Sequence, residues 1–184
     1  MKIKYKFVYT GSFVQGKGIE TIIALANHFK EFKFNVFGNL DTISSQNLNK
    51  CKYLKNLILN DYQSYFSICK ILLKSEYLLL PYEKKISVLI KNLDVSKYIS
   101  PLKMFEYLAT KKIIFASYNK TYNHILKNNY NSLLINSDKI KAWIKTINMV
   151  IKNQKKFEYL KKNAYETSKK YTWKKRCGLI LKFI

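Results

Sequence analysis

Long apolar runs are absent from this sequence of 184 residues, and arginine, histidine, cysteine and acidic residues are scarce. No stretch approaches the roughly 20 apolar residues that a membrane-spanning helix needs. The first residues alternate charged and apolar side chains, unlike a signal peptide. Three separated cysteines, Cys51, Cys69 and Cys177, argue against a disulfide framework. With two histidines, a zinc-type site has few ligands. These absences predict a cytoplasmic protein of one domain, spanning 1–184, that needs no metal and no cofactor.

The formal net charge of +23 comes almost entirely from lysine, since Arg176 is the single arginine. Lysine, asparagine, isoleucine, tyrosine and phenylalanine are all abundant, as in proteins from AT-rich genomes, and that bias adds lysine to every surface. Dedicated nucleic-acid binders favour arginine for bidentate contacts to bases and phosphates. We therefore expect no specific nucleic-acid partner. The charge should instead attract nucleoside diphosphates and an anionic membrane surface, placing the protein at the periphery of the inner face of the membrane.

Strand-length and helix-length segments alternate along the chain. This pattern predicts parallel βαβ units, hence an α/β domain with a Rossmann-like, doubly wound parallel sheet. The segment 83–99 has no clean period, and we expect a mobile loop there. Ligands of such sheets bind beyond the carboxyl ends of the strands, so the turns that follow strands are the segments of interest. The expected strands are 5–10, 32–37, 57–59, 77–80, 113–116 and 132–135, and the expected helices are 17–30, 42–51, 65–73, 100–110, 121–127, 139–151, 155–171 and 173–183.

The first turn after a strand combines three glycines with a lysine, in the order GSFVQGKG over 11–18. Glycine permits close backbone approach to a ligand, and a helix N-terminus favours an anion. Lys17, expected in the first helical turn, could then reach a diphosphate. The turn is neither a Walker A loop nor a G-x-G-x-x-G fingerprint. A glycine-rich turn that serves geometry alone is an equally good interpretation of the pattern.

A second candidate is the run SPLKMFE over 100–106. Ser100 suits a helix N-cap and Pro101 the first helical position, which would leave backbone N–H groups free to face an anion. Lys103 adds a cation, and Glu106, one turn later, could accept hydrogen bonds from sugar hydroxyls. From the pattern alone, the favoured interpretation is a well-capped helix on which Lys103 and Glu106 form a solvated pair.

Other side chains are weaker candidates. The histidines His28 and His124 are expected on helix surfaces, and Asp94 in solvent. Trp143 and Trp173 occupy apolar helical stripes, which predicts that both lie in the core.

In order and spacing, these pieces resemble the donor-binding domain of the retaining glycosyltransferase family 4, which has the GT-B fold. The run YTGSFVQGKGIETIIALANHFKEFKFNVFGN resembles that family's first strand, glycine loop, helix and second strand. The run SPLKMFEYLATKKIIFAS is the most specific match. The resemblance covers nearly the whole chain, and it implies the C-terminal half of a glycosyltransferase of the hexosyltransferase type, acting in surface-polysaccharide or lipid-linked glycan biosynthesis. The family's N-terminal acceptor-binding domain has no counterpart in this sequence.

The resemblance also implies roles for individual residues. Lys17, Lys103 and Glu106 are implied as the catalytic set, with both lysines on the diphosphate of a nucleotide sugar and Glu106 on the ribose. The implied substrate-binding residues are Gly11, Ser12, Gly16, Tyr82, Ser100, Pro101 and Leu102.

The sequence departs from the family pattern at two positions. Ser12 stands where many members have arginine, and Tyr98 stands where many have a glutamate eight positions before the ribose glutamate. Two alternatives remain open at this point: a non-catalytic nucleotide-binding or partner-binding module, and a basic nucleic-acid-binding domain.

Overall fold

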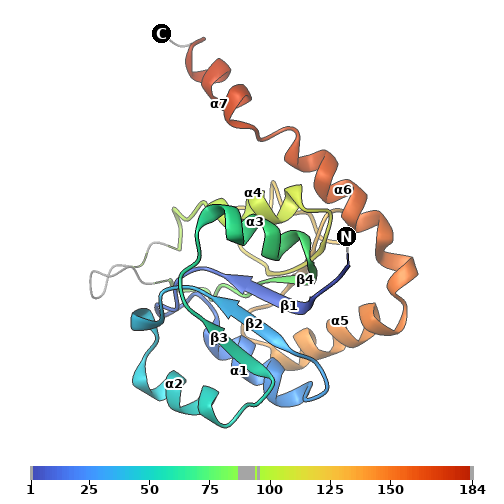
Figure 1. Ribbon diagram of the computed structural model, residues 1–184. Coiled ribbons are helices and arrows are strands. Elements are labelled where there is room, and N and C mark those ends of the chain that lie inside the picture. Colours follow the sequence, from blue (N-terminus) through green and yellow to red (C-terminus); the bar gives the residue numbers. More distant parts are fainter. Residues whose placement is uncertain (1, 87–93, 95, 183–184) are drawn as a thin grey trace.

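The computed structural model describes residues 2–86, 94 and 96–182. Its centre is a six-stranded sheet in the order β3-β2-β1-β4-β5-β6, with every neighbouring pair parallel (Figure 1). The predicted α/β fold with a doubly wound parallel sheet is therefore confirmed. The strands are β1 (Tyr5–Thr10), β2 (Phe34–Phe37), β3 (Leu57–Asn60), β4 (Ser75–Leu80), β5 (Ile113–Ser117) and β6 (Leu133–Ile135).

Helices cover both faces of the sheet (Figure 1). α1, α2 and α5 contribute to the core cluster on one face, and α3 and α4 to the cluster on the other. α6 contributes to both, through Leu160 and Ala164 respectively. α7 packs on neither, and it extends away from the body of the domain. The helices are α1 (Ile19–His28), α2 (Ser45–Lys52), α3 (Tyr65–Leu73), α4 (Leu102–Ala109), α5 (Ile140–Lys152), α6 (Glu158–Ser168) and α7 (Trp173–Ile180), with short 3₁₀ turns at Leu40–Thr42 and Gln154–Phe157.

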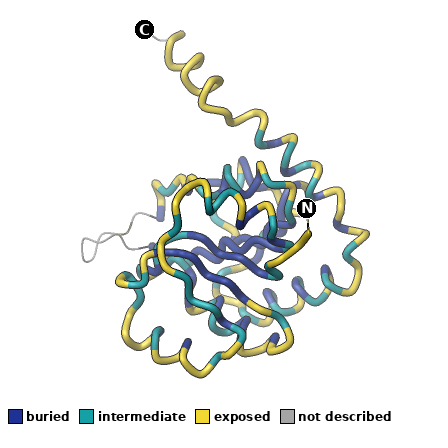
Figure 2. Tube along the Cα trace, viewed as in Figure 1, coloured by how far each residue is buried: buried dark blue, intermediate teal, exposed yellow. Residues whose placement is uncertain are grey.

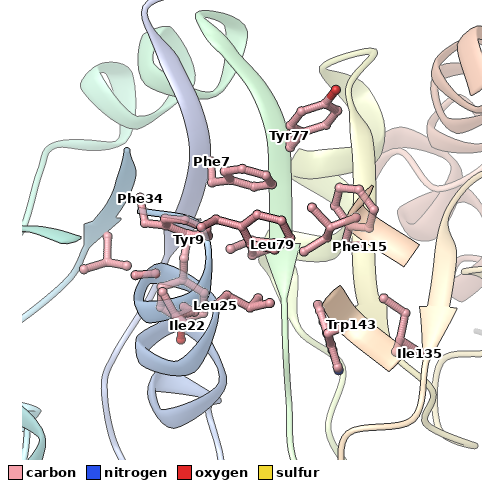
Figure 3. Packing of buried hydrophobic residues seen from close by; sticks show 14 of the residues in the cluster. Phe7, Tyr9, Ile22, Leu25, Phe34, Tyr77, Leu79, Phe115, Ile135 and Trp143 are labelled. Carbon is pink, nitrogen blue, oxygen red and sulfur yellow. The ribbon is translucent and has the colours of Figure 1, made fainter. Parts of the chain in front are cut away.

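The central strands alternate between the two core clusters with the period of two that a strand imposes. In β1, Phe7 and Tyr9 enter the cluster shared with α1 and α5, and Val8 between them enters the opposite cluster. Figure 3 shows Phe7 and Tyr9 in the cluster beside Phe34 and Leu25. Helices on both faces bury both sets of side chains, so apolar residues occur on both faces of these strands.

The strand order reverses between β1 and β4, which lie side by side and are parallel. In doubly wound sheets the crevice outside the carboxyl ends of the strands at such a reversal is the usual ligand site. The segments that leave β1 and β4 there are the glycine turn and the segment that begins at Pro81 and leads to the SPLKMFE run at the start of α4. The topology therefore brings together the two segments that the sequence singled out.

Several sequence predictions need correction. The segment 121–127 forms consecutive turns instead of a helix. α1 begins at Ile19, so Lys17 precedes the helix instead of lying in its first turn. Trp143 is buried as predicted, but Trp173 is 71% exposed. Trp173 lies on α7, and an apolar stripe is buried only where the fold supplies something to cover it. Figure 2 shows α7 exposed along its length.

Residues 87–93 and 95 of the segment 83–99, predicted as a mobile loop, lie outside the described residues, so its mobility stays a prediction. Of the described part, Ile86 is buried, and an Asp94 carboxylate oxygen accepts backbone hydrogen bonds from Ile86 (3.2 Å) and Ser96 (2.9 Å). Within the described chain, every helix is too short or too polar to cross a membrane.

Candidate functional site

Lys103, on the first turn of α4, points its amine into the protein. The residue as a whole is half-buried, yet its Nζ is fully buried and has no hydrogen-bond partner among the described residues. Lysine normally does the reverse, burying its stem and keeping its charge in water. Burial lowers the pKa of Lys103 well below its ordinary value, and the nearby Lys17 lowers it further, while Glu106 opposes the shift. Among the described residues, no carboxylate forms an ion pair with this amine to act as its counterion.

Two tyrosine rings line the position of the Lys103 amine. Its Nζ lies 3.9 Å from the centroid of the Tyr9 ring and 5.2 Å from that of Tyr82. Lys17 shares the Tyr82 ring, with its Nζ 4.8 Å from the centroid, and burial lowers the pKa of Lys17 as well. The electron-rich face of an aromatic ring attracts a cation but carries no net charge. The structure thus brings the two predicted lysines together around Tyr82 without neutralising them.

The N-terminus of α4 is open. Its N-cap position is Pro101, with φ −70° and ψ 116°, and no side chain caps it. The predicted cap by Ser100 is therefore wrong by one residue, because Pro101 already has the extended conformation that an N-cap adopts. Met104 N donates to Pro101 O at 3.0 Å, so the remaining free amides belong to the first residues of the helix. Ser100 and Leu102 are exposed beside this end, and Pro101 is buried.

Glu106 is half-buried one turn after Lys103 on α4. Burial raises its pKa, and the charge of Lys103 acts in the opposite direction. Across the described residues, the ion pairs within 4 Å do not include one between Lys103 and Glu106. The alternative of a solvated surface pair is therefore wrong, because the Lys103 amine points into the interior. A carboxylate at this position can accept hydrogen bonds from ligand hydroxyls.

The glycine turn is held by close backbone contacts that a side chain would prevent. Gly16 has φ 85°, its carbonyl accepts a hydrogen bond from Glu83 N at 2.9 Å, and a Cβ on it would overlap the Lys85 carbonyl oxygen. Gly11 has φ 134°, and a Cβ there would overlap the amine of Lys103. Gly16 thus serves the packing of the segment after β4. Gly11 lets the lysine of α4 reach the turn.

Ser12 is half-buried, and its carbonyl oxygen accepts a hydrogen bond from Tyr9 Oη at 2.8 Å. Tyr98, which replaces the glutamate of the family pattern, is 83% exposed. Ser12 is placed at the site through its backbone, and Tyr98 is not brought against the two lysines by any described contact.

A cavity of about 460 Å³ lies where β5 ends. Neither Lys17 nor Lys103 lines it. Within the part of the chain that the structure describes, no three histidine, cysteine, aspartate or glutamate side chains gather as they would around a metal ion. The cavity is lined by Lys84, Ser96, Lys97, Tyr118, Asn119, Lys120 and Thr121.

Two residues of the site escaped the sequence analysis. Tyr9 and Tyr107 both appear in the sequence as ordinary apolar positions, one in a strand and one in an amphipathic helix. Their hydroxyls form hydrogen bonds at the end of β1 and in the turn that follows it. The Tyr9 hydroxyl donates to the Ser12 carbonyl oxygen, and the Tyr107 hydroxyl accepts from the Thr10 backbone amide. A tyrosine among phenylalanines in a buried segment is the only signal in the sequence that a polar contact is needed there.

Comparisons with known proteins identify the family and the fold. The family model described as glycosyl transferases group 1 matches residues 2–167. No curated protein sequence matches the chain. The C-terminal domain of a group 1 glycosyl transferase family protein (LpcC) from Francisella tularensis superimposes with a TM-score of 0.65 at 17% identity, over 91% of this chain and 85% of that domain.

Two longer structures match at similar levels. Sucrose-phosphate synthase from Thermosynechococcus elongatus gives a TM-score of 0.77 at 15% identity, over 99% of this chain and 46% of that one. HepE from Anabaena, in complex with UDP, gives 0.76 at 13% identity, over 97% of this chain and 49% of that one. This chain therefore spans about half the length of these proteins, and it has the fold of the C-terminal half of a GT-B glycosyltransferase.

Proposed function

Because the chain belongs to the group 1 family of glycosyl transferases, we propose that it binds a nucleoside-diphosphate sugar. The proposed enzyme transfers that sugar, with retention at the anomeric carbon, to a surface-glycan or lipid-linked acceptor. The site lies at the reversal of strand order, between the turn after β1 and the N-terminus of α4.

The single observation that carries the proposal is the buried Lys103 amine, which has no hydrogen-bond partner in the described part of the chain. A buried charge without a partner is strongly unfavourable. Lys103 and Lys17 both lie near the Tyr82 ring, beside a helix N-terminus that no side chain caps. A diphosphate would supply the missing counterion to both lysines, and its oxygens would accept hydrogen bonds from the free backbone amides of α4. UDP-bound HepE, which shares the fold, supports a nucleoside diphosphate as that ligand.

The chemistry follows from the same charges. When the bond between the anomeric carbon and the diphosphate oxygen breaks, negative charge builds on the leaving diphosphate. Lys17, Lys103 and the α4 N-terminus stabilise that charge, which is electrostatic catalysis. Glu106 holds the ribose hydroxyls one turn further along α4. The acceptor oxygen bonds to the anomeric carbon, and its proton passes to the departing diphosphate oxygen.

A thermal-shift screen tests the proposal. UDP, GDP and their sugar conjugates are compared with the bare nucleosides and with inorganic pyrophosphate. A nucleoside diphosphate should raise the melting temperature by mass action, and more than either of its parts. If none raises it, the chain does not bind a nucleotide donor. A shift by any polyanion, DNA included, that disappears with added salt would instead favour a non-specific basic surface.

Transfer needs donor and acceptor in one closed cleft, and this domain provides one wall of it. We propose that a second Rossmann-like domain provides the acceptor wall. The 184-residue chain alone should then bind the donor and transfer negligible sugar. Nucleotide binding without transfer, even when an acceptor domain is added, would leave the alternative of a non-catalytic nucleotide-binding module.

A further inference from the structure

We propose that Tyr9 is a positioning residue for the diphosphate site, holding Lys103 with its ring and the glycine turn with its hydroxyl. The inference rests on the proposed function, because it concerns how the site is held ready for the diphosphate. Tyr9 is 1% exposed and belongs to the core around β1 and α1 (Figure 3). It lies beneath the site and acts through Lys103 and Ser12.

The ring of Tyr9 fixes the direction of the Lys103 amine. A lysine stem has several rotatable bonds, and the Lys103 amine has no hydrogen-bond partner among the described residues to select one orientation. Its ring contacts must therefore contribute to that orientation. The Nζ of Lys103 lies 3.9 Å from the Tyr9 ring centroid, against 5.2 Å for Tyr82. The closer ring holds the amine more strongly, since the attraction weakens with distance. Without the Tyr9 ring, the Lys103 amine would move toward the Tyr82 ring and toward the like charge of Lys17.

The hydroxyl of Tyr9 fixes the turn that faces this amine. It donates a hydrogen bond to the Ser12 carbonyl oxygen at 2.8 Å. On the other side of the turn, Gly11 N donates to Phe37 O at 2.8 Å. Gly11 has a positive φ of 134°, a backbone conformation that other residues rarely adopt. Because glycine is conformationally free, contacts from outside the turn must hold the backbone in this conformation. One side chain thus fixes both the turn and the amine that lies against it.

The experiment separates the ring from the hydroxyl. Calorimetric titrations with UDP and with uridine compare the wild type with Tyr9→Phe, which keeps the ring, and Tyr9→Leu, which keeps neither group. If the screen above selects guanine, GDP and guanosine are used instead. We expect Tyr9→Leu to lower the UDP affinity by about tenfold and to leave the uridine affinity unchanged. Tyr9→Phe should stay within about threefold of the wild type, because the ring is the part that holds the amine.

Phe7→Leu is the matched control. Phe7 lies two residues earlier on β1, in the same core cluster, and stacks on Phe34 with ring centroids 4.6 Å apart. Its truncation should lower the melting temperature as Tyr9→Leu does, without changing the UDP affinity. If Phe7→Leu weakens UDP binding as much as Tyr9→Leu, Tyr9 acts through general core stability and the proposal is wrong.

A double-mutant cycle identifies the partner. In a Lys103→Met background, Tyr9→Leu should have no further effect on UDP affinity, because the amine that it orients is gone. An undiminished effect in that background would overturn the role of the ring. If the wild type binds UDP and Tyr9→Leu binds it equally well, the inference about Tyr9 fails and the proposed function stands. If the wild type binds no nucleotide, the proposed function itself fails.

A measurement without any variant covers the case in which Tyr9→Leu does not fold. The Nζ of Lys103 lies 3.9 Å from the Tyr9 ring centroid, so we expect the NMR signals of the adjoining ε-methylene protons to be shifted upfield by the ring current. At saturating UDP that upfield shift should persist. Its loss on binding would show that the ring does not hold the amine against the diphosphate, and would overturn the proposal.

Discussion

The hydroxyl of Tyr107 accepts a hydrogen bond from the backbone amide of Thr10 at 3.0 Å, joining α4 to the end of β1. It also lies 3.2 Å from the Thr10 hydroxyl. Tyr107 is fully buried. Both residues are next to site residues in the sequence: Thr10 precedes the glycine turn, and Tyr107 follows Glu106 by one position. This bond therefore fixes the distance between two segments that are far apart in the sequence.

Tyr107→Phe should lower the free energy of unfolding by about 1–3 kcal/mol, because it leaves the buried Thr10 amide without an acceptor. Urea unfolding monitored by circular dichroism measures the change. Tyr53→Phe serves as the control, since Tyr53 is 87% exposed, and it should leave the free energy of unfolding nearly unchanged. Equal unfolding free energies for the wild type and Tyr107→Phe would show that water or a backbone shift satisfies Thr10.

Lys103→Met should stabilise the ligand-free protein by about 1–3 kcal/mol and weaken UDP binding. Methionine has a similar length, and it removes a buried polar group that lacks a partner in the described structure. A site that binds an anion is expected to carry such a destabilising group when empty. A variant that is less stable than the wild type would mean that the amine has a stabilising partner in the folded protein.

The stability gain of Lys103→Met should also depend on pH. The pKa of Lys103 in the folded protein lies below its unfolded value of 10.5. Between the two values the unfolded state binds more protons, so wild-type stability rises with pH across that window. The advantage of the methionine variant is therefore largest below the folded pKa and shrinks as pH approaches 10.5. Urea unfolding of both proteins over a pH series measures it; an advantage that grows with pH would contradict the assignment.

Glu106→Gln tests the ribose contact. If the carboxylate accepts ribose hydroxyls, the amide loses a charge-assisted hydrogen bond of about 1.5–3 kcal/mol. Affinity for both UDP and uridine should then fall by about tenfold to a hundredfold at constant melting temperature. Lys17→Met is the matched variant: it should weaken UDP binding and hardly affect uridine, because uridine has no diphosphate. Unchanged affinities for Glu106→Gln would remove Glu106 from the site.

Truncation after Tyr171 tests whether α7 contributes to the domain. The side chains of 172–182 are all exposed, whereas the Tyr171 ring lies 5.6 Å from that of Phe105 on α4. Removing 172–184 should therefore change the free energy of unfolding by less than about 0.5 kcal/mol and leave nucleotide affinity intact. Thermal melts and calorimetry of the two lengths decide the point. A large loss of stability would mean that α7 packs on the domain in solution.

Pattern and spacing determined much of this protein in advance. The alternation of strand-length and helix-length segments predicted the parallel doubly wound sheet, because both periods are local properties of the backbone. The order of the glycine turn and the SPLK run led to the family and to the two lysines. Local pattern failed where burial depends on distant partners: Trp173 has the spacing of a core residue, yet nothing in the domain covers α7.

Only the tertiary structure decided how the site is held. From the sequence alone, Lys103 and Glu106 made an ordinary surface pair, because their spacing on a helix permits one. Packing of α4 against the end of β1 turns the lysine inward, onto Tyr9 and against Gly11. Tyr9 and Tyr107 entered the sequence analysis as apolar positions because a hydroxyl's partner lies in another part of the chain. Propensity and period are encoded locally, whereas the environment of a side chain is set by segments that the fold brings together.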